Sequence, residues 1–262
     1  MPELYVNTAK ERLLKGEKLS AGWIQTGSPM ASEIMAQSGF DILVVDGEHG
    51  PVDPSNLIPI LHAMNGYGVM PMVRAPWNDF VSIKRLLDCG AMGIHIPYVN
   101  TPEEAAAAVS ACKYPPEGIR GIAGSPRAAG YGANLGNYLQ RANDQMLVMI
   151  ALETPQSVQN LDLLMDVKGV DGIFIGPTDL STTHGYFANA AHPEMQKIIR
   201  GIEDKVLARG DKLLATIASS ASAAKELYMR GYSYVIFASD GVTLRTTVSE
   251  MIKEFKNYIN PS

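Results

Sequence analysis

Two short apolar runs that each end near a carboxylate are the strongest candidates for chemistry in this chain. Glu153 follows Met149–Leu152, and Asp179 lies 26 residues later, after Gly172–Ile175 and a Gly-Pro turn. One helical pattern separates the runs, as in a βαβ unit, whose parallel strands end at the same rim. Two carboxylates on one rim can hold a divalent cation and leave positions open for a substrate. Either carboxylate alone could instead cap the following helix; as a pair they favour a metal site.

Three ionisable side chains occupy one tight turn after another apolar run, Ile42–Asp46. The turn reads Asp46-Gly47-Glu48-His49. A histidine beside carboxylates has its tautomer fixed and can act as a general base near neutral pH. The alternative is an ordinary hydrogen-bonded loop histidine, but the acidic neighbours and the position at a strand end favour the base.

Arg74 directly follows the apolar run Val69–Val73. An arginine in this position needs an anionic partner, because burial of an unpaired guanidinium is costly. A substrate carboxylate or its enolate would supply that partner, and so would an ion pair with Glu48 or Glu153.

These residue types indicate a reaction class. A cation held by two carboxylates can chelate a 2-oxo acid and stabilise the enolate formed by C–C cleavage or by proton loss at C3. Arg74 would share the negative charge, and His49 would take or deliver the proton. No lysine ends a predicted strand, so a Schiff-base mechanism is less favoured than a metal mechanism.

Eight strand-like runs alternate with helical patterns and would position these side chains. The runs are near-continuously apolar, as expected for parallel strands covered on both faces. The predicted strands are Ala21–Gln25, Ile42–Asp46, Val69–Val73, Gly93–Ile96, Leu147–Leu152, Gly172–Ile175, Leu213–Ile217 and Tyr234–Ala238. Eight such units predict a single (β/α)8 TIM barrel domain spanning residues 1–262. A doubly wound open sheet is the alternative, but the glycine-rich nucleotide fingerprint is missing.

Two stretches exceed a minimal barrel. Lys113–Asp144 is rich in Gly, Pro and Arg, and could bind an anionic group or pack against a neighbouring subunit. Ser181–His192 could form a lid or an oligomer contact. Two single residues read as structural: His95 as a buried, hydrogen-bonded core group, and Asp88 as a solvated helix residue.

Composition excludes several classes of protein. The chain has 262 residues, 46% of them hydrophobic and 19% charged, and a net charge of -5. A net negative charge does not indicate a basic surface for binding nucleic acid. Neither a signal peptide nor an apolar run of about 18 residues is present, so we expect no membrane span. Cys89 and Cys112 lack metal-binding spacing, so we expect free thiols and a cytoplasmic location.

Several motifs together resemble the HpcH/HpaI aldolases, which are class II, metal-dependent pyruvate aldolases typified by 4-hydroxy-2-oxoheptanedioate aldolase. The likeness runs from about Leu14 to Phe255. The motifs are Phe40-Asp41 through Asp46-Gly47-Glu48-His49, Arg74-Ala75-Pro76-Trp77-Asn78, Tyr114-Pro115-Pro116-Glu117-Gly118-Ile119-Arg120-Gly121, and Gly169 through Ser181.

The resemblance implies a TIM barrel of the phosphoenolpyruvate/pyruvate type, with a last helix exchanged between subunits of a hexamer built as a trimer of dimers. It implies Mg, Mn or Co on residues matching Glu153 and Asp179, with pyruvate or its enolate bound to the ion. Arg74 matches the residue that stabilises the enolate, and His49 matches the base. The remaining matches are Asp46 and Asp88 as acidic partners of the base, and Trp23, Gly176, Pro177 and Thr178 as substrate contacts.

Three positions depart from the family pattern. Ala151 stands where the family usually has a glutamine that orients the keto acid, two residues before Glu153. The turn after the first strand lacks the usual serines. The loop with Gly124 and Ser125, which we expect to contact the aldehyde, also differs.

We therefore predict a metal-dependent aldolase that reversibly cleaves a 4-hydroxy-2-oxo acid to an aldehyde and pyruvate, or a close analogue such as hydroxypyruvate, through a metal-bound enolate. One alternative is an oxaloacetate decarboxylase using the same site. The other is a barrel that binds a small acid without turning it over.

Overall fold

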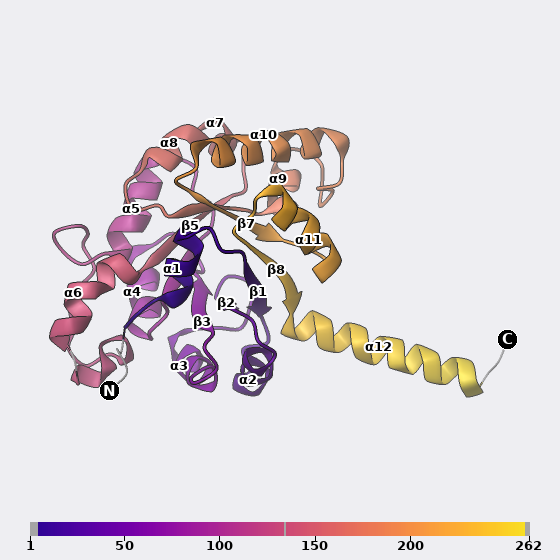
Figure 1. Cartoon of the computed structure of the whole chain (residues 1–262), viewed down its shortest axis with the longest axis horizontal. Coiled ribbons are helices and arrows are strands. Elements are labelled where there is room, and N and C mark those ends of the chain that lie inside the picture. The colour runs from indigo at the N-terminus through magenta and orange to yellow at the C-terminus, as the bar shows by residue number, and fades with distance from the viewer. Residues whose placement is uncertain (1–4, 134, 260–262) are drawn as a thin grey trace.

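The computed structural model describes residues 5–133 and 135–259, and its strands form one closed parallel barrel in sequence order (Figure 1). The strands are β1 Leu19–Ile24, β2 Ile42–Asp46, β3 Met70–Arg74, β4 Gly93–Ile96, β5 Leu147–Leu152, β6 Gly172–Ile175, β7 Leu213–Ile217 and β8 Tyr234–Ser239. The predicted (β/α)8 barrel is confirmed. All eight predicted strands are present, with ends shifted by at most two residues.

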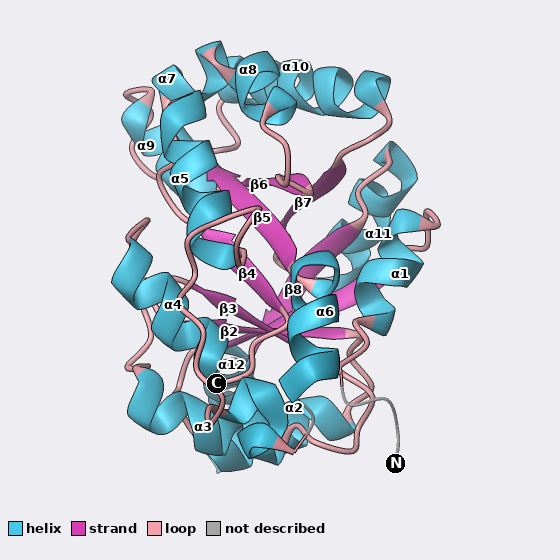
Figure 2. Cartoon of the chain, turned by 90° about the vertical axis from the view of Figure 1, so that its left-hand side faces the viewer, coloured by secondary structure: helices cyan, strands magenta, loops and turns pink. Residues whose placement is uncertain are grey.

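Helices alternate with the strands, and most of them cover the outside of the barrel (Figure 2). They are α1 Thr8–Leu14, α2 Pro29–Gln37, α3 Pro54–Ala63, α4 Phe80–Asp88, α5 Pro102–Cys112, α7 Pro155–Gln159, α8 Leu161–Asp166, α10 Pro193–Arg209, α11 Ala221–Arg230 and α12 Asp240–Ile259. Capping residues and prolines in the sequence define where several of these helices begin. Thr101 and Thr154, for example, each form a capping box immediately before a proline in the first helical turn.

Two predicted loop regions contain regular structure. The stretch Lys113–Asp144 holds a 3-10 segment, η1 (Arg127–Gly132), and the helix α6 (Leu135–Gln145). A further short helix, α9 (Pro177–Thr183), overlaps the start of Ser181–His192. Apolar residues such as Tyr138 and Ala142 on α6 pack with Tyr5 and Tyr114 in a small separate core, which accounts for the order of this region.

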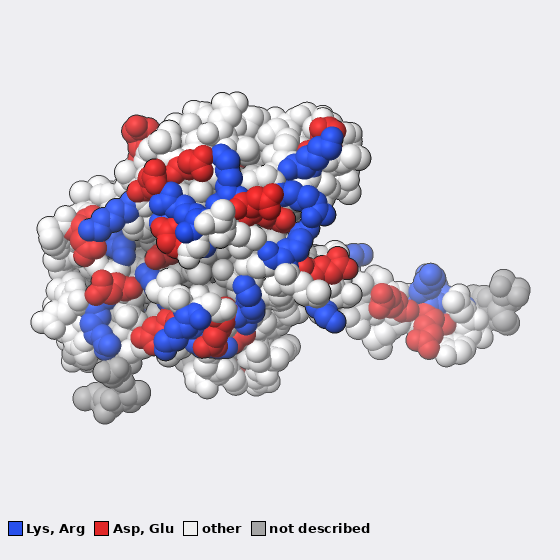
Figure 3. Space-filling view, turned by 45° about the horizontal axis from the view of Figure 1, so that its top comes forward, with Lys and Arg blue, Asp and Glu red and all other residues white. Residues whose placement is uncertain are grey.

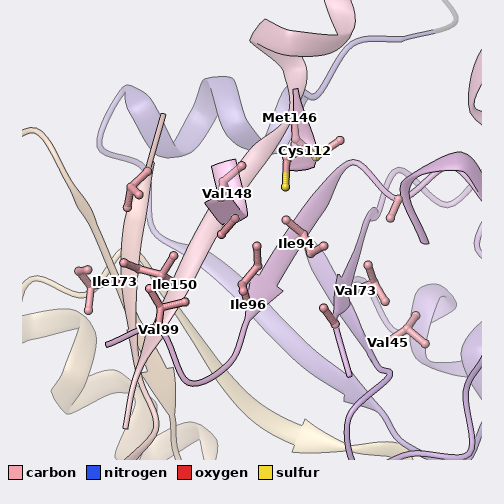
Figure 4. Close-up of a cluster of buried hydrophobic side chains, with 14 of the residues drawn as sticks. Val45, Val73, Ile94, Ile96, Val99, Cys112, Met146, Val148, Ile150 and Ile173 are labelled. Atoms are coloured by element: carbon pink, nitrogen blue, oxygen red, sulfur yellow. The ribbon is translucent and has the colours of Figure 1, made fainter. Parts of the chain in front are cut away.

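Alternation along the strands divides the core into two layers. Met70, Met149 and Phe174 belong to the inner cluster inside the barrel. Strand residues of the other parity belong to a second cluster that they share with helix residues, and Figure 4 shows Ile94, Ile96, Val148 and Ile150 within this cluster. Because side chains alternate with a period of two, the last inward positions reach the carboxyl-terminal mouth of the barrel.

The C-terminal helix α12 extends away from the barrel rather than packing along it (Figure 1). Its large apolar side chains are accordingly exposed: Val242, Leu244, Val248, Met251, Ile252, Phe255, Tyr258 and Ile259. Exposure of so many large apolar side chains on one helix is characteristic of an interface.

Acidic and basic side chains are interspersed over the face drawn in Figure 3. Among the described residues, no helix combines the length and apolarity that crossing a bilayer requires.

Close packing at the barrel wall leaves no room for a side chain at position 172, where the residue is Gly172. A Cβ atom at this position would lie 2.4 Å from the Leu213 carbonyl oxygen and 2.6 Å from the Leu213 Cβ. We predict that Gly172→Ala lowers the free energy of unfolding by about 2–3 kcal/mol, measured by urea denaturation.

The matched control is Gly201→Ala in the middle of α10, where no atom lies within 4 Å of an added Cβ. This variant should raise stability by about 0.5–1 kcal/mol, because alanine loses less backbone entropy in a helix. Equal effects of the two substitutions would contradict the packing described for Gly172.

Candidate active site

A cavity of about 330 Å³ opens at the carboxyl-terminal mouth of the barrel. Its lining contains most of the residues that the sequence singled out. The full lining consists of Trp23, Gln25, His49, Arg74, Glu153, Phe174, Gly176, Pro177, Thr178, Asp179 and Ile217. Side chains from the ends of β1, β2, β3, β5 and β6 therefore converge on one space, as the parallel barrel requires.

Glu153 is a buried carboxylate, with 3% of the residue exposed. One oxygen accepts a hydrogen bond of 3.0 Å from the backbone N–H of Tyr98. Burial raises the pKa of Glu153 to about 7; repulsion from Glu48 and Asp179 adds to this rise, and the Tyr98 bond opposes it. The charge of Arg74 lowers the pKa only in part, so the carboxyl group is partly protonated near neutral pH.

Gly176 allows Glu153 to occupy this position. A Cβ atom on Gly176 would lie 2.7 Å from a carboxylate oxygen of Glu153. Asp179 lies three residues further on, in the first turn of α9, and faces the same cavity. The two carboxylates predicted to share one rim are brought to one cavity.

This arrangement suits a divalent cation. Within residues 5–133 and 135–259, no group of three or more His, Cys, Asp or Glu side chains forms a metal cluster. Glu153 and Asp179, which line the same cavity, could contribute two carboxylate ligands, and a keto acid could complete the coordination shell. A cation would also relieve the electrostatic cost that raises the Glu153 pKa.

Arg74 is fixed by a bidentate ion pair with Asp46. Its Nε donates to Asp46 Oδ1 at 2.9 Å, and its Nη2 donates to Oδ2 at 2.7 Å. The two residues are register partners on β2 and β3, and Asp46 is fully buried. Burial alone would raise the pKa of Asp46, but the Arg74 guanidinium, together with hydrogen bonds from Gln25 and the His49 backbone, outweighs burial and lowers it. The anionic partner that Arg74 requires is thus mainly Asp46.

Glu48 and His49 extend this network toward solvent. Arg74 Nη1 lies 3.1 Å from Glu48 Oε2, and the same oxygen lies 3.8 Å from His49 Nε2. The His49 side chain is 62% exposed, so it can reach a bound substrate or water. The backbone N–H groups of Glu48 and His49 both donate to Asp46 Oδ1 at 3.1 Å, which holds the turn.

Gln25 also belongs to the site, although the sequence analysis gave it no role. Its Nε2 donates to Asp46 Oδ2 at 2.9 Å, and its Oε1 accepts from the Ser239 hydroxyl at 2.8 Å. Strand alternation could have revealed it, because Ala21 and Trp23 point into the barrel and Gln25 is the next residue of that parity.

Aromatic side chains form the floor beneath the charged groups. The Arg74 guanidinium lies 4.5 Å from the centre of the Trp23 ring. His95 packs against Trp23 and Phe174 and is hydrogen-bonded to the Tyr234 hydroxyl, so the prediction of a buried, bonded core histidine is confirmed. Burial, with a smaller contribution from nearby Arg74, lowers the pKa of His95 to about 3, so the ring is neutral.

Three predicted site residues lie elsewhere. Asp88 pairs with the buried guanidinium of Arg120 at 2.8 Å and is not among the residues lining the cavity. Gly124 and Ser125 follow Arg120 in the excursion before η1, outside the cavity lining, and Gly124 lies beside Leu135. Within a single subunit, these three residues therefore do not line the cavity at the mouth of the barrel. Their roles in the site remain predictions.

Fold and site together define a (β/α)8-barrel enzyme whose mouth combines carboxylates with an arginine suited to an anionic substrate. The sequence profile of the HpcH/HpaI aldolase/citrate lyase family matches residues 20–247. The chain belongs to this family, and it is a carbon–carbon lyase of the aldolase type.

Individual relatives agree over almost the whole chain. A hydroxypyruvate/pyruvate aldolase from Sagittula stellata is 41% identical, over 93% of this chain and 96% of the relative. A 5-keto-4-deoxy-D-glucarate aldolase from Shigella dysenteriae is 37% identical, over 97% and 98% respectively. The crystal structure of a family member from Burkholderia cenocepacia superposes with a TM-score of 0.91 at 30% identity, covering 96% of this chain and all of the other.

A pH prediction follows from Glu153. Its pKa of about 7 lies above the ordinary value of 4.5, so the folded state binds this proton more tightly than the unfolded chain does. The stability contributed by the protonated carboxyl is complete below about pH 4.5 and is lost as pH rises through 7. Without metal at pH 8, Glu153→Gln should therefore raise the free energy of unfolding by about 2–3 kcal/mol.

Chemical denaturation at pH 5 and pH 8, with and without Mg or Mn, measures this effect. Added metal should stabilise the wild type at pH 8 and leave Glu153→Gln unchanged. Glu226→Gln, at an exposed position on α11, is the matched control and should behave as wild type. The opposite result would refute the argument: without metal, the free energy of unfolding of the wild type would rise relative to that of Glu153→Gln between pH 5 and pH 8.

Proposed function

We propose that Glu153 and Asp179 hold a divalent cation, Mg, Mn or Co, and that the site reversibly cleaves a 4-hydroxy-2-oxo acid into an aldehyde and pyruvate or hydroxypyruvate. The observation that carries the proposal is the pair of carboxylates facing the same cavity as Arg74, with the Glu153 pKa raised to about 7. The name of the Sagittula relative supports both keto acids as donors.

The cation would act as a Lewis acid that polarises the keto group and orients the acid. Arg74, fixed by Asp46, holds its positive charge beside the oxygen on which negative charge develops. Because Asp46 positions the guanidinium before substrate arrives, little reorganisation accompanies the reaction.

His49 serves as the base. In the cleavage direction it removes the proton from the C4 hydroxyl, the C3–C4 bond breaks, and its electrons form the enolate while C4 becomes an aldehyde. Protonation at C3 then gives the free keto acid. The exposed His49 ring next to Glu48 can exchange this proton with water. Trp23, Pro177 and Thr178 would bound the keto acid, since all three line the cavity.

We also propose that α12 packs against a neighbouring subunit in a hexamer, by exchange of this helix between protomers. The apolar stripe formed by Leu244, Val248, Met251, Ile252 and Phe255 supports this assembly. The two buried free thiols, Cys89 and Cys112, support a cytoplasmic location.

Loss of one metal ligand should abolish the reaction. We predict that Glu153→Ala and Asp179→Asn each lower kcat for pyruvate release at least 10³-fold, and that Arg74→Lys lowers it about 10²-fold because the bidentate geometry is lost. Pyruvate release from 4-hydroxy-2-oxo acids, and from oxaloacetate as the competing substrate, provides the measurement.

Chelation of the wild type should stop turnover, and Mg, Mn or Co should restore it to different extents. Glu226→Gln serves again as the control and should retain full activity. Activity that survives in Glu153→Ala would eliminate the metal from the mechanism, whereas a strong preference for oxaloacetate would identify a decarboxylase.

The apolar stripe on α12 should control assembly. The double substitution Leu244→Asp/Met251→Asp should convert the hexamer into smaller species at micromolar concentration, because it places charges among buried apolar contacts. Light scattering after size-exclusion chromatography measures the mass. The control, Asn257→Asp, adds a charge on the opposite face of the helix and should leave the mass unchanged. Equal masses for the wild type, the double variant and the control would argue against the interface.

A further inference from the structure

A second hollow lies directly beside the catalytic cavity. It is a groove of about 460 Å³ between the end of β7, the end of β8 and the first turns of α12. Trp23, Gln25 and Ile217 line both spaces. The groove is therefore continuous with the place where the keto acid would bind, and it is large enough for a chain of several carbons.

The lining of this groove differs from that of the catalytic cavity. Ile217, Ala218 and Phe237 form an apolar wall. The groove is also lined by five hydroxyl side chains: Ser219, Ser239, Thr243, Thr246 and Thr247. Of the described residues that line the groove, none carries a charge, whereas the cavity is lined by Arg74, His49 and two carboxylates.

Gln25 marks the boundary between the two spaces. Its amide is held on one side by Asp46, at 2.9 Å, and on the other by the hydroxyl of Ser239, at 2.8 Å. The side chain is thus fixed between the arginine–carboxylate network and the hydroxyl-lined groove. A substrate that spans both spaces must pass this amide.

We propose that the groove binds the hydroxylated carbon chain of a neutral aldehyde, the electrophile in the condensation direction. The inference rests on the proposed function, in which the new bond forms at C3 of a keto acid bound in the cavity. The remaining carbon atoms of the aldehyde must then extend from the cavity into an adjoining space, and the groove is such a space. The apolar wall packs against carbon atoms, and the Ser and Thr hydroxyls exchange hydrogen bonds with the hydroxyls of the aldehyde. The uncharged lining offers no ion-pair partner to a carboxylated aldehyde.

Three aldehydes of equal carbon number test the proposal with pyruvate as donor. They are glyceraldehyde, propanal and malonic semialdehyde, which carry hydroxyls, no polar substituent and a carboxylate respectively. The double variant Ser219→Ala/Thr243→Val removes two hydroxyls at nearly constant volume. Ser249→Ala, an exposed position on the same helix outside the groove, is the control.

The double variant should lower kcat/KM for glyceraldehyde by about 4- to 100-fold, from roughly 2- to 10-fold for each of the two hydrogen bonds lost. For propanal and malonic semialdehyde the change should stay below about 2-fold. The control should match wild type for all three. Equal losses for all aldehydes, no loss for glyceraldehyde, or a changed oligomeric mass in the double variant would overturn the assignment of the groove.

Deuterium exchange of the pyruvate methyl group, measured by NMR without any aldehyde, separates this inference from the proposed function. The exchange requires only the keto acid and the catalytic cavity, so the groove variants should retain the wild-type rate. A wild type that shows neither exchange nor cleavage would remove the proposed function and the groove assignment together. Normal exchange with unaltered aldehyde preference would remove the groove assignment alone.

Discussion

The buried ion pair between Arg74 and Asp46 is the constraint on which the rest of the site depends. It follows from the register of β2 and β3, which sets these residues side by side at the mouth of the barrel. The pair costs desolvation energy, and the two parallel hydrogen bonds offset that cost. In return, the guanidinium has one orientation, and the turn that carries Glu48 and His49 is anchored to the same Asp46 oxygen.

The other half of the site has the opposite electrostatic character. Glu153 has a backbone N–H and no guanidinium as its hydrogen-bond partner, and it faces further negative charge from Glu48 and Asp179. On one side of the cavity, a guanidinium is therefore paired with carboxylates, whereas on the other side the described hydrogen-bond partner of Glu153 is a neutral backbone N–H. In the proposed reaction, this asymmetry would favour a cation beside Glu153 and the anionic oxygens of a keto acid beside Arg74.

The barrel could be predicted from the sequence because eight apolar runs of similar length recur with helical patterns between them. The pair Glu153 and Asp179 could be predicted because both follow buried strands that are adjacent in a parallel barrel. Gln25 was missed because an uncharged amide gives no signal of its own; only its parity with Trp23 indicates its direction. The helix α6 was missed because Gly and Pro earlier in Lys113–Asp144 suggest a loop, while the packing of Tyr138 against Tyr5 depends on contacts distant in sequence.

Ala151 connects these observations to the chemistry. Where the family usually carries a glutamine, this chain has a methyl group in the inner core, paired in register with Phe174, whose ring packs against His95. The centre of the barrel beneath the site is thus filled by aromatic rings. An amide is present instead on β1's side of the mouth, at Gln25, where it holds Asp46 and borders the groove. Gln25 therefore links the Arg74–Asp46 network at the mouth to the groove beside α12.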